Sequence, residues 1–154
     1  MGVTLSRAAI KGGLYTLEPQ VIDIGKPIGN RVKTYIGIAG GNYGVEICSI
    51  GFFFDNFRIC NKDNGYWPGT AQPGNKYPND MSSFLLKLNK DPRKEGDHTY
   101  AFAAINDEVL PAYTYDRLTP DFPTCDQVLI FNSTEYTHVG VRDLTPHVQY
   151  ALIQ

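Results

Sequence analysis

Apolar residues recur at every second position in several short segments of this chain. In residues 32–38, Val32, Ile36 and Ile38 fall on one side, as in a strand with one sheltered face. In residues 100–105 both sets of alternating positions are apolar, and residues 128–131 form a continuous apolar run. Groups of Gly, Pro, Asn and Asp separate the segments at roughly 8–12-residue spacing. The pattern predicts about ten short strands.

The expected fold is all-β: a single antiparallel β-sandwich of jelly-roll or Greek-key type over residues 1–154. Helical alternatives look short, because Gly12-Gly13 follows residues 5–10 directly and Phe84, Leu86 and Leu88 alternate as in a strand. Strands do not alternate with long helical segments, which disfavours a parallel α/β sheet. The remaining strands are expected at residues 51–57, 109–115, 136–141 and 148–153.

Charge and cysteine content limit the partners and the compartment. The 154 residues carry a formal net charge of −2, without a large basic cluster, so we expect no nucleic-acid partner. No stretch is long and apolar enough for a membrane span. Three cysteines without a C-x-x-C pair predict free, buried thiols, which favours cytoplasmic synthesis, with a virion as another location.

The sequence contains none of the motifs that usually mark catalytic residues. There is no Gly-x-Ser-x-Gly motif, and His98, His138 and His147 lack metal-ligand spacing. Asp107-Glu108 follows a strand and is interpreted as a solvated turn. The sequence therefore predicts no enzyme, no catalytic residues, no metal and no cofactor. A small hydrolase whose residues converge only in three dimensions, with Asp107, Glu108, His98 and His138 as the residues to test, is the third alternative.

The aromatic residues favour an assembly function. If residues 51–57 form a strand, Phe52 and Phe54 lie on one face and Phe53 on the other, so both faces need cover. Either the long loop that follows Cys60 covers Phe53, or a second subunit does. Because low net charge favours association, we predict a homo-oligomer or a structural subunit of a larger particle, such as a viral or phage coat, cement or tail component. Its interface is Phe52, Phe53 and Phe54.

A long loop at residues 61–81 supports the alternative of a lectin-like carbohydrate-binding domain. Loops of this length are usually functional or disordered. Flat aromatic faces and planar polar groups together suit a sugar ring and its hydroxyls, with glycans as partners. The predicted ligand-binding residues are Asn61, Asp63, Tyr66, Trp67, Asn75, Tyr77 and Asp80.

Overall fold

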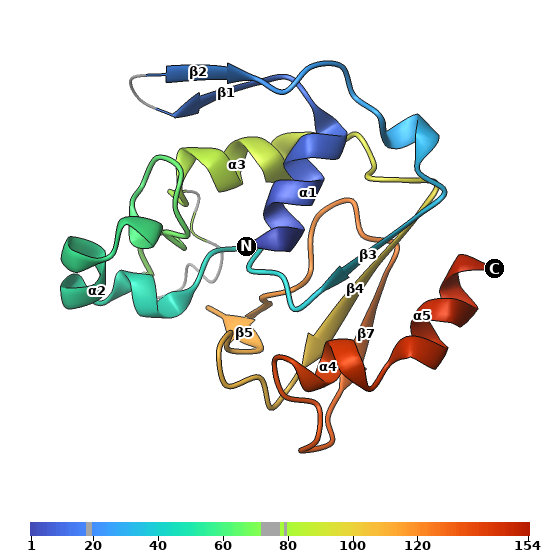
Figure 1. Ribbon diagram of the computed structural model, residues 1–154. Helices are drawn as coiled ribbons and strands as arrows, with labels where there is room; N and C mark the ends of the chain where they lie inside the picture. The colour runs from blue at the N-terminus through green and yellow to red at the C-terminus, as the bar shows by residue number, and fades with distance from the viewer. Residues whose placement is uncertain (18–19, 72–77, 79) are drawn as a thin grey trace.

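A parallel sheet of three strands forms the centre of the chain in the computed structural model, which describes residues 1–17, 20–71, 78 and 80–154. The strands are β3 (Thr34–Ile38), β4 (His98–Ala104) and β7 (Gln127–Phe131), in the order β3-β4-β7 (Figure 1). Both pairings are parallel. The carboxyl ends of all three strands therefore lie at the same edge of the sheet.

Helices cover both faces of this sheet. On one face, Phe102 and Ala104 pack with Val141 of α4 (Gly140–Asp143) and with Val148 of α5 (Pro146–Ile153). On the other face, Ala101 packs with Tyr35, Phe122 and Ile10, the last from α1 (Gly2–Lys11). Figure 1 shows α1 on one side of the strands and α5 on the other. The result is a layered α/β arrangement.

The other elements are short. Two small antiparallel hairpins are present, β1–β2 and β5–β6. α3 packs on α1, and a series of short helical turns precedes it. The bounds are β1 Leu14–Leu17, β2 Gln20–Asp23, η1 Gly29–Arg31, η2 Glu46–Ser49, α2 Gly51–Asn56, η3 Arg58–Cys60, α3 Ser83–Lys90, β5 Tyr113–Thr114 and β6 Arg117–Leu118.

The predicted antiparallel sandwich is wrong. The strands predicted at residues 32–38, 100–105 and 128–131 agree closely in position with β3, β4 and β7, but these strands run parallel. A strand covered on both faces reads as a continuous apolar run, because both sets of alternating side chains are buried. Residues 101–104 are all buried, as expected for a central parallel strand. The same pattern also fits a strand inside a sandwich, which is why the sequence predicts one.

The short-turn interpretation of residues 5–10 is wrong for a different reason. The buried residues of α1 are Thr4, Arg7, Ala8 and Lys11, which recur with helical spacing. Two of them carry charge, so a search for apolar periodicity does not find this face. Gly12, with φ +63°, ends the helix and donates its N–H to the carbonyl of Ala8.

Three more predicted strands contain helical residues. Ser82 caps α3 by accepting a hydrogen bond from the N–H of Leu85, and Leu85 and Leu88 are its buried residues. Pro146 begins α5, a position where its missing N–H costs nothing. Residues 140–143 form α4. Among the described residues no helix has the length and apolar character needed to span a membrane.

The aromatic segment that begins at Gly51 forms α2 rather than a strand. The helical turns on either side of it fold back, and Cys48 and Cys60 form a disulfide with their Cα atoms 4.9 Å apart. The prediction of three free thiols is therefore wrong, and its argument for cytoplasmic synthesis is lost. Only Cys125 is free, because pairing depends on distances in space that the cysteine spacing does not reveal.

Candidate active site

Two side chains meet beyond the carboxyl ends of β4 and β7. Asp107 follows β4, and His138 follows β7. The two strands are parallel neighbours, so the segments that leave them emerge at the same edge of the sheet. His138 Nδ1 lies 2.8 Å from Asp107 Oδ2. The Asp107 side chain is 3% exposed and that of His138 is 32% exposed, so the carboxylate is buried and the ring is open on one side.

The turn at Asp107 and Glu108 holds this pair in place. Asp107 Oδ1 accepts hydrogen bonds from the backbone N–H groups of Val109 and Leu110, at 2.8 and 2.7 Å. Glu108 Oε2 accepts one from the backbone N–H of His138 at 3.0 Å, and this bond lowers the pKa of Glu108. Asp107 therefore orients the ring of His138, and Glu108 fixes the backbone of the same residue.

The contact with Asp107 determines what the His138 ring can do. An ionised carboxylate only accepts hydrogen bonds, so Nδ1 carries the ring proton and donates a hydrogen bond to Asp107 Oδ2. Nε2 of the neutral ring is then a proton acceptor, with its lone pair pointing away from Asp107. A base oriented in this way by a buried carboxylate is the arrangement that activates a hydroxyl nucleophile.

An apolar cavity of about 340 Å³ opens beside the ring. Its lining includes His138, the Cys48–Cys60 disulfide and side chains from the segment between the two cysteines. Phe53 and Phe57 contribute from that segment, and Met1 contributes from the start of α1. A cavity of this size and character can take a hydrocarbon chain whose reacting end lies at His138.

A second hollow of about 390 Å³ adjoins the same ring. Its lining includes His138, Gly2, Ser6 and Arg142, and is more polar than that of the apolar cavity. His138 therefore lies between two hollows, and the N-terminal end of α1 contributes Met1 to the first and Gly2 to the second. The unpaired N–H groups and the dipole of a helix favour negative charge at this end.

The start of α1 is held close to the sheet. A Cβ atom on Gly40 would lie 2.6 Å from Val3 Cγ1, so the loop after β3 needs glycine at this position. The Tyr35 hydroxyl donates to the Val3 carbonyl at 3.0 Å and lies 2.9 Å from Ser6 Oγ. Burial raises the pKa of Tyr35 to about 12, so the phenol keeps its proton. These contacts fix the first turn of α1 relative to β3.

A buried ion cluster holds the rest of α1. Glu95 Oε1 lies 2.8 Å from Arg7 Nε and 3.2 Å from Lys11 Nζ, and all three side chains are inaccessible to solvent. Arg7 also donates to the Oδ1 atoms of Asn42 and Asn89, at 2.9 and 3.0 Å. The cluster connects α1 to the loop after β3, to α3 and to the segment before β4.

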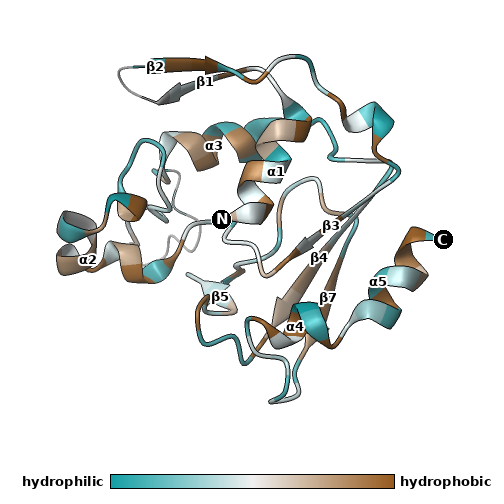
Figure 2. Cartoon of the chain, viewed as in Figure 1, coloured by the Kyte–Doolittle hydropathy of each residue, from teal (hydrophilic) through white to brown (hydrophobic). Residues whose placement is uncertain are grey.

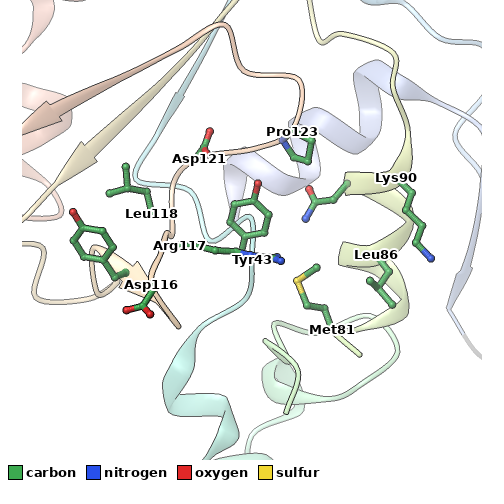
Figure 3. A pocket seen from close by; sticks show the side chains of 11 residues that line it. Tyr43, Met81, Leu86, Lys90, Asp116, Arg117, Leu118, Asp121 and Pro123 are labelled. Atoms are coloured by element: carbon green, nitrogen blue, oxygen red, sulfur yellow. The ribbon is translucent and has the colours of Figure 1, made fainter. Parts of the chain in front are cut away.

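A separate hollow of about 640 Å³ lies between α3 and the 113–123 segment (Figure 3). The guanidinium of Arg117 lies 4.8 Å from the centre of the Tyr43 ring, and Asp121 and Lys90 line the same space. Burial raises the pKa of Asp121. Neither His138 nor Asp107 lines this hollow.

One of the comparisons with known proteins identifies the family of this chain. A family model described as Lipase (class 2) matches residues 1–151. The chain belongs to the class 2 lipase family. Searches of curated proteins and of solved structures found no match. In lipases of the α/β-hydrolase type the acid precedes the histidine in the chain, and Asp107 and His138 have this order.

Membership of the lipase family overturns three predictions from the sequence. The structural-subunit function, the lectin-like alternative and the prediction that the chain is not an enzyme are wrong, because the family match indicates a hydrolytic enzyme. These predictions followed from the aromatic residues, from the composition of the 61–81 loop and from the lack of a catalytic motif. Once β4 and β7 are parallel, the acidic turn after one and the histidine after the other become the expected place for a site.

The residues predicted to bind a ligand differ in exposure. Tyr66 and Trp67 are only 7% and 8% exposed. Asn61 accepts the N–H groups of residues 63–65 in a local turn, where Asp63 is exposed, and Asp80 bonds to Thr70. Asn75 and Tyr77 lie outside the described residues. A shared ligand site for this set stays a prediction.

The predicted interface residues lie on α2. Phe52 is 66% exposed, and Phe53 is half-buried in the wall of the apolar cavity. The side chain of Phe54 lies outside the described part of the structure. Association with other copies of the chain stays a prediction. In the described residues no group of three or more His, Cys, Asp or Glu side chains is arranged to hold a metal ion.

Proposed function

We propose that this chain carries the base and the acid of a serine-type hydrolase acting on lipid esters. His138 is the general base, and Asp107 orients its ring and stabilises the positive charge that the ring gains. The contact between His138 Nδ1 and Asp107 Oδ2, at the mouth of an apolar cavity, carries this proposal. Membership of the lipase family supports it.

The proposed reaction moves one proton through His138 Nε2. The nucleophile attacks the carbonyl carbon of the ester as its hydroxyl proton passes to Nε2. The protonated ring then gives this proton to the oxygen of the leaving alcohol, and the C–O bond of the ester breaks. In the second half, water donates a proton to Nε2 as its oxygen attacks the acyl carbon, and the bond between that carbon and the nucleophile oxygen breaks. Nε2 returns the proton to the nucleophile oxygen, and the acyl group leaves as a carboxylic acid. Asp107 remains ionised throughout.

The position of the nucleophile follows from the position of the ring. In α/β-hydrolases the nucleophile lies in a sharp turn between a strand and a helix. Here α1 is the helix whose N-terminal end lies at the His138 ring, as the lining of both hollows indicates. The nucleophile is expected within hydrogen-bond reach of His138 Nε2, beside this end of α1. Negative charge on the ester oxygen would develop near the positive end of the α1 dipole.

The test compares histidine variants in the protein as it is naturally produced. The assay is hydrolysis of p-nitrophenyl butyrate below its solubility limit. His138→Ala is expected to lower kcat/KM by at least about 10³-fold, and Asp107→Asn by about 10²–10⁴-fold, because the ring loses its oriented tautomer. His98→Ala is the matched control, because His98 is exposed at the start of β4, the end of the strand opposite to Asp107. Parental kcat/KM in His138→Ala would refute the proposal.

A further inference from the structure

The hollow between α3 and residues 113–123 is a second concave surface on this chain, and we call it the α3 hollow (Figure 3). Its volume of about 640 Å³ is in the range of small-molecule sites, about 300–1,000 Å³. Figure 2 shows hydrophobic and hydrophilic residues mixed along α3, which forms one wall. His138 and Asp107 do not line it, so it is separate from the proposed hydrolytic site. The apolar side chains that line the hollow are Met81, Leu86, Leu118 and Pro123.

Tyr43 lies in the middle of the α3 hollow. In Figure 3 its hydroxyl points toward the side that holds Asp121 and Pro123. The guanidinium of Arg117 lies 4.8 Å from the centre of the Tyr43 ring, so a cation–π contact holds the ring. Burial raises the pKa of Tyr43 to about 12, and the charge of Asp121 acts in the same direction. The phenol therefore keeps its proton, and among the described residues it has no hydrogen-bond partner.

Asp121 brings a half-buried carboxylate to the hollow. Its Oδ1 accepts a hydrogen bond from the N–H of Phe122 at 2.7 Å. Burial raises the pKa of Asp121, and the positive charge of Arg7 opposes this shift. Arg7 is already paired with Glu95, at 2.8 Å from Nε to Oε1. In the part of the chain that the structure describes Asp121 makes no ion pair, so its charge is partly removed from water without a counter-ion.

Lys90 brings a positive charge to the same hollow. It is the last residue of α3 and is exposed, and no described acidic side chain pairs with it. A ligand with a single charge is attracted by one of Lys90 and Asp121 and repelled by the other. A ligand that carries both charges can place each beside its opposite. The two unpaired groups therefore favour a zwitterion.

The two walls of the hollow are held together by Asn42, which is inaccessible to solvent. Asn89 of α3 lines the hollow, and its Nδ2 donates to the Asn42 carbonyl at 2.8 Å. Asn42 Nδ2 donates in turn to the carbonyl of Pro120, next to Asp121, at 2.8 Å. Oδ1 of Asn89 accepts a hydrogen bond from Arg7 at 3.0 Å. Both polar ends of the Asn89 amide are thus engaged, and the hollow is formed before a ligand binds.

We propose that the α3 hollow binds a zwitterionic amino acid with an apolar side chain. Asp121 and the hydroxyl oxygen of Tyr43 accept hydrogen bonds from its ammonium group, and Lys90 pairs with its carboxylate. The apolar side chain of the ligand packs on Met81 and Leu86. The proposal concerns binding alone and does not depend on the proposed hydrolytic function.

The test measures the affinity of the parent chain for L-leucine by isothermal titration calorimetry. N-acetylleucine lacks the ammonium group and should bind at least about tenfold more weakly, because its carboxylate meets Asp121 without compensation. Glycine lacks the apolar side chain and should also bind at least about tenfold more weakly. Leucinamide lacks the carboxylate and should lose about two- to fivefold in affinity, because an exposed pair with Lys90 contributes little.

Two variants locate the site on the chain. Asp121→Asn keeps the shape of the side chain and an acceptor oxygen, and should lower leucine affinity at least about tenfold. Its control, Asp143→Asn on α4, should bind like the parent. Lys90→Met should lower leucine affinity about two- to fivefold. The control for this change is Lys87→Met on the same helix, because Lys87 lies over the Tyr15 ring, outside the hollow.

Three outcomes would overturn the binding proposal. The first is no detectable heat from leucine at millimolar concentration with the parent chain, together with an unchanged melting temperature. The second is unchanged leucine affinity in an Asp121→Asn variant that melts like the parent. The third is equal affinity for leucine and one of the two analogues that lack a charge, which would assign the hollow to a ligand with a single charge. The analogues probe the parent chain, so this comparison stands even where a variant fails to fold.

Discussion

Replacing Glu95 by Gln tests the ion cluster under α1. Glu95 is the acidic partner of both Arg7 and Lys11, and none of the three side chains is accessible to solvent. Glu95→Gln keeps the shape of the side chain and removes its charge, which leaves two buried cations without a counter-ion. Breaking a buried pair in this way costs about 3–5 kcal/mol. At about 2–4 °C per kcal/mol for a chain of this size, Tm should fall by about 6–20 °C.

The assay is urea unfolding followed by far-UV circular dichroism. Asp143→Asn is the control, because Asp143 pairs with Arg142 on the surface and its removal should leave the unfolding free energy unchanged within error. Adding Lys11→Met to Glu95→Gln should recover part of the loss, because one of the two uncompensated cations disappears. A loss below about 1 kcal/mol in Glu95→Gln would refute the reasoning about uncompensated charge.

The loss of unfolding free energy caused by Glu95→Gln should also depend on pH, and it should decrease as pH rises. Burial lowers the pKa of Lys11 from its usual 10.5, and Glu95 opposes this shift. Without Glu95 the folded pKa of Lys11 falls further, so between that lowered pKa and 10.5 the unfolded chain binds more protons than the folded chain. This excess is lost as pH rises toward 10.5, and the penalty of Glu95→Gln shrinks. A penalty that grows between pH 8 and pH 10.5, relative to the parent, would contradict this sign.

Two further predictions concern the cysteines. Reduction of the Cys48–Cys60 disulfide, which closes a loop with a sequence separation of 12, should lower the unfolding free energy by about 3 kcal/mol; a melting temperature that is equal with and without reductant would contradict this. Burial raises the pKa of Cys125 to about 11, so iodoacetamide at pH 8 should alkylate the native thiol at least about a hundredfold more slowly than the urea-unfolded thiol. Equal alkylation rates for the native and unfolded protein, measured by mass spectrometry, would show that burial does not control the reactivity of this thiol.

The strands of the central sheet could be located from local pattern. Residues 34–38, 98–104 and 127–131 fall largely within segments where alternation or continuous apolar character predicted strands. The helices were less accessible. The buried face of α1 contains Arg7 and Lys11, whose burial depends on Glu95, which lies far along the chain. An apolar-period argument cannot detect such a face, because the compensating charge is not local.

The candidate site shows the same limit. Asp107 and Glu108 were recognised as an acidic turn at a strand end, and His138 as an isolated histidine. The pairing required the direction of two strands, since an antiparallel arrangement would send these segments to opposite edges of the sheet. The disulfide and the cavity likewise depend on how residues 45–60 fold back on Tyr66.

Sequence by itself determined roughly where the three strands of the central sheet lie and that residues 100–105 are apolar on both sides of their strand, because alternation and apolar runs are local properties of a few residues. Tertiary structure decided that these strands are parallel, that Asp107 contacts His138 and that two cysteines join. Each of these depends on residues brought together from distant parts of the chain, 31 positions apart for the His–Asp pair. Such contacts arise from packing the whole chain, which leaves no periodic trace in any one segment.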